Sequence, residues 1–501
     1  MAKPQHIKAD ILEYSLKQVD ACVHKILTSN YDVVGLSCFI FNVKENIELI
    51  QKLKAQKPKL KIYCGGPEAT YHPEVFFNQA IDGILRGEAE FSFWKAIEGL
   101  DTPGFQRKLE DKVSVLRTDL KELEKLESPY FLDFDQKEMN NRFLYMEASR
   151  GCPYGCTYCM ASLDRKVRLF SLEHLKANIA RLNDFNVFQV KFLDRTFNLN
   201  PDFSLEIAKT CVQVKSSTNF HVELVGDQIR EDLLNFFIEH HDRFRMEIGV
   251  QSFDADVLKK VGRFSNLPKL KEVIARFASV NAIQHTDLIA GLPTESLEGL
   301  KSSFFQLFEL KPYEIQLGIL KLLNGTILYD QIEGMGYTFE KEAPYQVLEN
   351  PWMSALDIKQ VEYAALAVEK TYNANRLKTL LIKNFIEDKD VFDVFVKMGK
   401  AIAALNHPYS VDQFYMALYE VLKNRIVDAR YHFERDYYQQ FKLKPKRLFE
   451  DRTLSNVKVD IKALVKRQPE FSKASFIRLI NPQQDIEFIV YQDETCYHVK
   501  V

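Results

Sequence analysis

The strongest constraint on the fold of this chain is a regular alternation of strand-like and helix-like segments after residue 142. Strand–helix repeats of this kind form a parallel sheet that closes into a barrel or part of one. The predicted fold class is therefore α/β, with a partial (β/α)6 TIM-like barrel over residues 143–328, and chemistry is expected at the carboxyl ends of its strands. Its six strand-like segments cover residues 143–149, 187–194, 219–226, 244–250, 282–291 and 314–322.

A second alternation comes before the first, over residues 1–105. It predicts a Rossmann-like (flavodoxin-like) domain whose parallel sheet is covered on both faces. Gly65 and Gly66 follow one of its strands, at the edge where such sheets bind ligands. The four strand-like segments cover residues 10–15, 31–39, 60–66 and 82–88.

The other regions follow different patterns. Residues 106–142 are charged and irregular, and we interpret them as a linker. Residues 329–501 are expected to form a mostly helical C-terminal domain, with helices rich in tyrosine and phenylalanine over residues 354–440. Its last segment, residues 475–501, has the pattern of an antiparallel hairpin or small sheet.

Composition argues against several classes of protein. The 501 residues carry a net charge of −2, so the basic bias of a nucleic-acid-binding protein is absent. The sequence shows neither a signal peptide nor an apolar run of the length that a membrane span needs, and we expect a cytoplasmic protein. Disulfides are rare in that compartment, where clustered cysteines more often bind metal or take part in catalysis.

Three of the eight cysteines lie in one short segment. Cys152, Cys156 and Cys159 follow the spacing C-x3-C-x2-C, with Gly151 and Gly155 between and beside them. Structural thiols are one interpretation. A zinc site is another, although structural zinc uses four ligands, usually in two pairs, and a distant histidine would have to complete the set. Three thiolates in one tight loop best suit a [4Fe–4S] cluster that keeps one iron free of protein ligands.

The segment around these cysteines, EASRGCPYGCTYC, resembles the cluster loop of radical S-adenosylmethionine (SAM) enzymes. The resemblance covers residues 143–325 and implies that Cys152, Cys156 and Cys159 are the cluster ligands. It implies that the amino and carboxylate groups of SAM bind the open iron. It also implies that one electron from the reduced cluster cleaves SAM to a 5′-deoxyadenosyl radical.

The resemblance extends to residues around the adenine of SAM. Tyr158 stands at the aromatic position before the last cysteine, whose backbone meets the adenine in this family. Ile289 and Gly291, in the segment HTDLIAGLP, match the fifth-strand motif beside the adenine.

Polar residues at the ends of three other strands match positions that contact SAM. Asp194 falls where the family contacts the SAM amino group, although the usual glycine-rich form of that motif is absent. Glu223, Glu247 and Gln251 follow on the third and fourth strands, where polar side chains commonly face SAM. The alternative is that these carboxylates only pair with nearby cations, as Asp194 could with Arg195. Burying such groups without partners costs several kcal/mol.

The N-terminal domain resembles the cobalamin-binding domain of one subgroup of radical SAM enzymes. Ser37, Gly65 and Gly66 fall at positions that line the cavity for the nucleotide tail, and residues 86–90 (RGEAE) resemble the segment before the last helix of that domain. The expected first strand and its helix are missing, and no Asp-x-His-x-x-Gly motif occurs. Three interpretations follow: cobalamin binds without a protein histidine, the chain is shortened and binds it poorly, or the sheet is kept for packing.

These observations predict a radical SAM enzyme with a [4Fe–4S] cluster and SAM that depends on cobalamin and transfers a methyl group to an unactivated carbon. A radical SAM enzyme without cobalamin and a non-catalytic metal-binding protein are the alternatives. The expected partners are a small-molecule or peptide substrate and an electron donor such as flavodoxin or ferredoxin. Arg150, Arg263, His285 and the pair His240–His241 are interpreted as solvated or structural.

Overall fold

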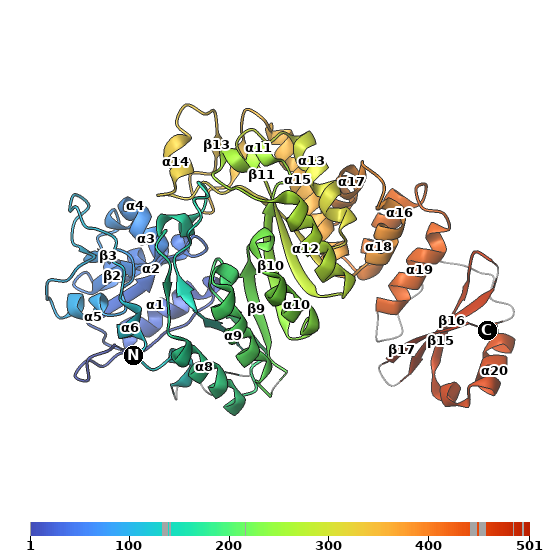
Figure 1. Cartoon of the computed structure of the whole chain (residues 1–501), viewed down its shortest axis with the longest axis horizontal. Coiled ribbons are helices and arrows are strands. Elements are labelled where there is room, and N and C mark those ends of the chain that lie inside the picture. Colours follow the sequence, from blue (N-terminus) through green and yellow to red (C-terminus); the bar gives the residue numbers. More distant parts are fainter. Residues whose placement is uncertain are drawn as a thin grey trace.

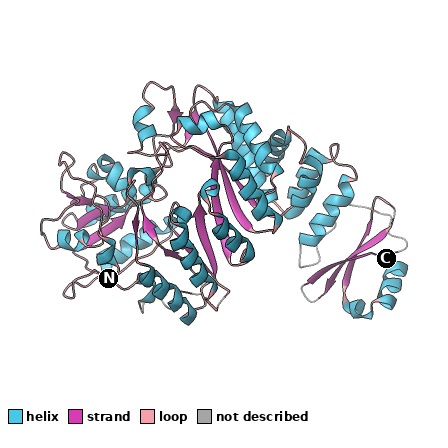
Figure 2. Cartoon of the chain, in the orientation of Figure 1, coloured by secondary structure: helices cyan, strands magenta, loops and turns pink. Residues whose placement is uncertain are grey.

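The computed structural model describes residues 2–132, 139, 142–215, 217–440, 448–449, 457–483, 485–492 and 495–500. Figure 1 shows a small N-terminal sheet in blue, a larger sheet in green, and a helical region that leads to a small red sheet near the C-terminus. Figure 2 shows helices packed along both sheets. Across the described residues, the model has no helix with both the length and the apolar character for crossing a membrane.

The N-terminal sheet has four strands in sequential order. The first three are parallel, and the short fourth strand runs antiparallel to the third. Apolar side chains of the first two long helices and of the strands form one buried core. The elements are α1 (Val19–Thr28), β1 (Val33–Ser37), α2 (Val43–Gln56), β2 (Lys61–Gly65), α3 (Pro67–Tyr71), α4 (Pro73–Phe77), β3 (Gly83–Leu85), α5 (Ser92–Ile97) and β4 (Phe105–Gln106).

The strand predicted at residues 10–15 is wrong, because these residues form no strand. In the doubly wound order 2-1-3-4-5, the second strand hydrogen-bonds only to the first. No first strand is found among the described residues, so residues 10–15 have no neighbour to pair with. β1 is consequently an edge strand, and Ser37 at its end is exposed.

All six strands predicted after residue 142 are present in one parallel sheet. They are β5 (Phe143–Met146), β8 (Gln189–Phe192), β9 (Asn219–Leu224), β10 (Phe244–Gln251), β11 (Ile283–Ala290) and β12 (Glu314–Ile319), and they lie side by side in chain order. The helices between them are α8 (Leu172–Arg181), α9 (Pro201–Val212), α10 (Glu231–Glu239), α11 (Ala255–Lys260), α12 (Leu267–Ser279) and α13 (Leu297–Glu309).

The two faces of this sheet differ in character. Buried and half-buried residues alternate along β9, β10 and β11. The buried residues, such as Val222, Ile248 and Leu288, share one apolar core with the helices. The other face, which we call the open face, carries polar and charged side chains. Parallel sheets are usually apolar on both faces, so a polar face indicates a functional surface.

The segments that border the sheet supply short elements. A two-stranded ladder of β6 (Ser149–Arg150) and β7 (Arg168–Leu169) encloses residues 151–167, which we call the cluster loop. Before it comes α6 (Leu120–Leu123), and after β12 come α14 (Ile327–Gln331) and the antiparallel pair β13 (Thr338–Phe339) and β14 (Val347–Glu349).

The rest of the chain is mostly helical and ends in an antiparallel sheet of three strands, as the sequence predicts. Helix α15 (Ala355–Val368) packs against β12 and against α17 (Val391–Ala403). The elements are α15 (Ala355–Val368), a π-helical turn (Glu369–Asn373), α16 (Lys378–Phe385), α17 (Val391–Ala403), α18 (Val411–Leu422), α19 (Ala429–Gln440), α20 (Val457–Arg467), β15 (Ser475–Ile480), β16 (Ile486–Gln492) and β17 (Thr495–Lys500).

The side chain of Asn373 covers the outer edge of β12. Its amide oxygen accepts a hydrogen bond from the Ile315 amide at 3.0 Å, and its amide nitrogen donates to the Ile315 carbonyl at 2.9 Å. A side-chain amide thus takes the place of a neighbouring strand, which protects an edge that would otherwise be open to pairing.

Candidate active site

The cluster loop begins just beyond the carboxyl end of β5 and holds all three clustered cysteines. Cys152 and Cys156 are buried and Cys159 is half-buried. Gly151 has a positive φ of 98°, and a Cβ at this position would lie 2.6 Å from the Lys166 carbonyl oxygen. Only glycine fits so close a turn.

Two other parts of the chain brace the cluster loop. The Thr157 amide donates to the Val261 carbonyl at 2.9 Å, and the Thr157 carbonyl accepts from the Leu328 amide at 2.8 Å. Gly262 lies so close that a Cβ there would be 2.6 Å from the Gly155 carbonyl oxygen. The loop is therefore held between the end of α11 and the start of α14.

The β6–β7 ladder, which we call the neck of the cluster loop, is held by the N-terminal domain. Arg150 and Arg168 are cross-strand neighbours on β6 and β7. Glu88, in the segment that follows β3, accepts from Arg150 Nη1 at 2.9 Å and from Arg168 Nη2 at 2.5 Å. The Thr118 amide donates to the same carboxylate at 2.9 Å. Opposed like charges destabilise a ladder, so Glu88 allows the neck to close.

The number of thiols suits a cluster. A [4Fe–4S] cube takes each of three thiolates at a separate iron, whereas structural zinc uses four ligands. Burial raises the pKa of the Cys159 thiol, opposed by a backbone hydrogen bond at Ala161 and by the positive charge of Arg195. Metal coordination would deprotonate such a thiol.

Asp194 supports the start of this loop. Its side chain is buried, with 3% exposed, and its two oxygens accept from the Ala148 amide at 2.8 Å and from the Ser149 hydroxyl at 2.5 Å. Burial raises its pKa to about 6. The suggested partner Arg195 binds Glu223 instead. Asp194 thus holds residues 148–149, and its contact with SAM stays a prediction.

Five charged residues form a connected group on the open face. Arg195 donates to Glu223 at 3.1 Å, and Lys191 lies 3.8 Å from Glu223 and 3.1 Å from Glu247. His221 Nε2 lies 3.0 Å from Glu247. Burial opposes ionisation of Glu247, but the hydrogen bond from His221 and the charge of Lys191 lower its pKa to about 2. Glu223 therefore pairs with nearby cations, which is the alternative that the sequence analysis left open.

A second charged group occupies the neighbouring strands. His285 on β11 lies 3.2 Å from Glu314 and 3.3 Å from Asp287, and Gln316 Oε1 is 2.7 Å from its Nε2. Burial would lower its pKa, but hydrogen bonds to Asp287 and Glu314 raise it to about 10. The sequence interpretation of His285 as an ordinary surface or core residue missed this group. The sequence did contain a signal for this group, because polar and apolar residues alternate along several adjacent strands.

Gln251 ends β10 in an unusual conformation. Its φ is +69°, and the pairing with β11 shifts register between Gly249 and Gln251. Its side-chain oxygen is buried and makes no protein hydrogen bond among the described residues. Strain and an unsatisfied buried oxygen together are typical of a ligand-binding position. Behind it, buried Ser252 donates to Glu295 at 2.7 Å.

Tyr158 and Ile289 meet in one apolar cluster beside the cluster loop, together with Val261, Leu292 and Leu320. The Gly291 carbonyl oxygen accepts from the Tyr337 hydroxyl at 3.1 Å and from Asn350 Nδ2 at 3.0 Å, and Tyr337 packs against the same cluster. The structure therefore brings together Tyr158 and Ile289, which the sequence predicts near the adenine.

Arg263, interpreted as solvated or structural, lies beside the cluster loop. It donates to the Gly249 carbonyl at 2.6 Å. Burial would lower its pKa, but interactions with Tyr158 and Cys156 raise it. Arg263 therefore connects the end of β10 to the cysteine segment.

The residues predicted to bind cobalamin lie together at the carboxyl ends of β1 and β2. Ser37 and Gly65 are paired neighbours in the sheet. A Cβ on Gly65 would meet no atom nearer than 3.7 Å, so packing within the chain does not require glycine here. Gly66 is different: its φ is +94°, and a Cβ would lie 2.6 Å from the Cys38 carbonyl oxygen, so backbone packing alone requires glycine there.

Comparison with known families assigns the main regions. Residues 146–307 match the family described as Radical SAM superfamily, and residues 1–93 match the B12 binding domain. The chain carries a B12-binding domain followed by a radical SAM domain. Residues 333–485 match a protein family of unknown function (DUF4080). The cofactors of this radical SAM protein are a [4Fe–4S] cluster, SAM and cobalamin, and the three-cysteine loop, Gln251 and the open ends of β1 and β2 fit them.

Curated relatives of this radical SAM protein include methyltransferases. It is 26% identical over 332 residues to the cobalamin-dependent radical SAM methyltransferase TokK of Streptomyces tokunonensis, covering 58% of this chain and 47% of the relative. It is 28% identical over 321 residues to the 2-(S-pantetheinyl)-carbapenam-3-carboxylate methyltransferase of Streptantibioticus cattleyicolor, covering 56% and 46%. The chain thus spans about half the length of these relatives.

Solved structures share its fold. The cobalamin-dependent SAM radical enzyme OxsB with aqua-cobalamin bound matches with a TM-score of 0.56 at 15% identity, over 90% of this chain and 75% of that one. The radical SAM methyltransferase TsrM of Kitasatospora setae, with cobalamin and a [4Fe–4S] cluster bound, matches with a TM-score of 0.51 at 15% identity, over 65% and 68%.

Proposed function

We propose that this protein is a cobalamin-dependent radical SAM methyltransferase that transfers a methyl group to an unactivated carbon. The observation that carries the proposal is the placement of the cluster loop. It leaves the carboxyl end of β5 beside the open face, and Glu88 of the B12-binding domain is bound to its neck. The named activities of the relatives TokK and the carbapenam methyltransferase support the same reaction class.

In this proposal the six-stranded sheet is a partial (β/α)6 barrel, and the open face is its inner surface. Cys152, Cys156 and Cys159 hold the cluster, which supplies the electron that cleaves SAM. Gln251 contributes its unsatisfied oxygen, and Tyr158 and Ile289 contribute an apolar surface for the adenine. Ser37 and Gly65 border the cobalamin.

The substrate is proposed to be a polar small molecule or peptide. The open face presents cations and carboxylates in close pairs, including Lys191 with Glu247 and His285 with Glu314. Such pairs can exchange partners with a substrate that carries charges of both signs, at little cost in unpaired buried charge. The reducing electron is proposed to come from a flavodoxin or ferredoxin.

Anaerobic purification tests the proposal. We expect iron, sulfide and corrinoid to bind after reconstitution, and SAM to be cleaved to 5′-deoxyadenosine under reducing conditions. Cys156→Ala should lose iron and SAM cleavage. Cys211→Ala removes a buried thiol on α9, remote from the loop in sequence, and should keep both. Zinc in place of iron, or full activity in Cys156→Ala, would refute the proposal.

One observation favours a second candidate, a radical SAM enzyme that does not use cobalamin. β1 is an edge strand, because no first strand of the doubly wound sheet is found among the described residues. A protein that never takes up corrinoid yet still cleaves SAM would establish this candidate and exclude the first.

A further inference from the structure

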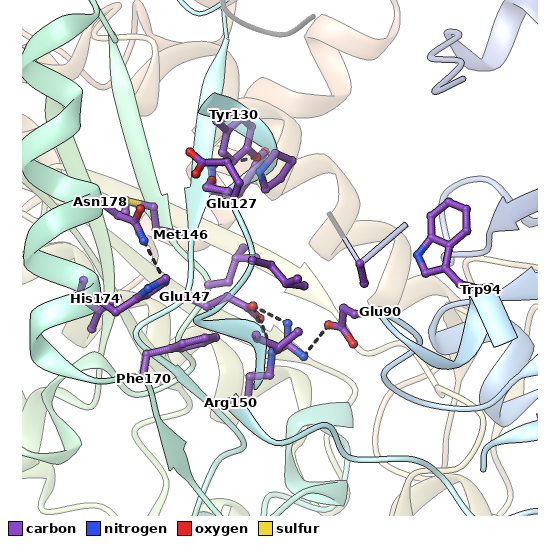
Figure 3. A pocket seen from close by; sticks show the side chains of 18 residues that line it. Glu90, Trp94, Glu127, Tyr130, Met146, Glu147, Arg150, Phe170, His174 and Asn178 are labelled. Carbon is purple, nitrogen blue, oxygen red and sulfur yellow. Dashed lines mark hydrogen bonds and ion pairs between the residues drawn. The ribbon is translucent and has the colours of Figure 1, made fainter. Parts of the chain in front are cut away.

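A cavity of about 540 Å³ lies between the two sheets. Figure 3 shows its walls, which come from α5, the segment 123–130, β5 and α8. This volume is in the usual range for a small-molecule site. The cavity also lies at a boundary between two domains, where such sites are common.

Most of the lining is apolar or aromatic. Trp94 of the N-terminal domain lies on one side in Figure 3, and Phe170 and His174 lie on the other. The rings of Phe170 and His174 stack with centroids 5.8 Å apart. Tyr130 and Met146 complete this wall (Figure 3). Such a surface suits the apolar body of a ligand, and its rings also suit a cation.

The remaining wall is charged and is centred on Arg150. Glu147 accepts from Arg150 Nε at 3.1 Å and from Nη2 at 2.8 Å. Glu90 and Glu88 accept from Nη1 at 2.7 and 2.9 Å. Figure 3 shows Glu90 and Glu147 reaching Arg150 from opposite sides. Since Arg150 already uses four of its five N–H groups in these contacts, it has almost no donor left for a ligand.

The carboxylates of this wall, in contrast, keep acceptor capacity. Each carboxylate offers about four acceptor positions, and the second oxygen of Glu90 accepts only from the Thr118 hydroxyl at 3.3 Å among the contacts described. Of the residues that line the cavity, Glu90 and Glu147 both bind Arg150, so two negative charges face one positive charge there. The wall therefore suits a ligand that brings donors and a positive charge.

We propose that this cavity binds a primary amine with an aromatic or bulky apolar body. Its ammonium group donates to Glu90 and Glu147, and its body packs between Trp94 and Phe170. None of the cavity's walls includes a cysteine of the cluster loop, so amine binding does not require the metal cluster. Arg150 borders the cavity and also belongs to the neck of the cluster loop. An amine bound in the cavity would therefore change the surroundings of a residue two positions before Cys152.

Titration calorimetry on the full chain, without cluster, SAM or cobalamin, tests the inference. The probes are 2-phenylethylamine, the uncharged 2-phenylethanol and the anionic 3-phenylpropionate. We expect the amine to bind at least tenfold more tightly than the alcohol, and the acid to show no binding. Trp94 and Trp352 are the two tryptophans of the chain, so Trp352→Phe leaves Trp94 as the single indole, and its fluorescence should report the same affinity.

Two variants test which carboxylate of the cavity wall binds the ammonium group. Glu147→Gln should weaken amine binding about tenfold, whereas Glu127→Gln should leave it within twofold, because Glu127 lines the same cavity but pairs with Arg181. Thermal melting confirms that each variant is folded. The inference is overturned if no probe binds, if the acid binds as well as the amine, or if both variants have the same affinity as the unmodified chain.

Discussion

Arg150 and Arg168 lie directly opposite each other on the β6–β7 ladder, and one carboxylate from another domain binds both. Two guanidinium groups in this position would repel each other. Glu88 removes that repulsion and at the same time fastens the N-terminal domain to the cluster loop. The loop that would hold the metal therefore depends on a residue more than sixty positions earlier in the chain.

Glu88→Gln should destabilise the protein by about 2 kcal/mol, because the two arginines lose the carboxylate that they share. The loss is smaller than for a fully buried broken pair, since Arg150 keeps Glu90 and Glu147 and Arg168 keeps Asp164. Urea unfolding measures this change, and reconstituted protein should also show a lower iron content. Glu206→Gln is the matched control, since it breaks only exposed pairs with Lys176 and Lys209 and should cost clearly less stability. Equal effects of the two variants would contradict this role of Glu88.

Gln251→Gly should separate stability from ligand binding. Relief of the positive φ gains about 1 kcal/mol, and the added freedom of glycine in the unfolded chain costs about the same, so the free energy of unfolding should hardly change. SAM affinity should fall about tenfold with the loss of the side-chain amide. Equilibrium dialysis measures it. Lys311→Gly, at another positive φ of 53°, should keep SAM affinity.

The buried carboxyl of Glu295 should make the free energy of unfolding depend on pH. Burial raises its pKa to about 8, well above the usual value near 4.5. A carboxyl that is harder to ionise in the folded state loses stability as pH rises from 4.5 to 8. Glu295→Gln cannot ionise, so its advantage over the unmodified chain should grow by about 2.5 kcal/mol between pH 6 and pH 9. Glu298→Gln, on the exposed side of the next turn, should show no such trend.

His285 predicts a second pH effect through a different group. Its pKa of about 10 in the folded chain exceeds the unfolded value near 6.5, so its ion pairs stabilise the protein fully below pH 6.5. This contribution should be lost as pH rises from 6.5 to 10, by on the order of 2 kcal/mol after allowance for solvent screening. The free energy of unfolding of His285→Gln, measured in urea, should not show this loss. His240→Gln, which removes a ring packed on Phe236, should retain it.

The strands and the cysteine loop could be predicted from sequence because both depend on local spacing. Apolar periodicity identifies each strand, and Cys152, Cys156 and Cys159 lie within eight residues. The contacts of Glu88 could not be predicted, because they join segments that meet only after both sheets have formed. Residues 10–15 show the opposite error: a local pattern indicated a strand, but a strand forms only where a neighbour exists to pair with it.

Asn373 has a consequence for how the sheet could grow. Its side-chain amide takes up both the backbone amide and the carbonyl of Ile315 on β12. A strand added from a second molecule would have to displace this side chain before it could pair there. Asn373 therefore disfavours edge-to-edge association of two copies of the chain.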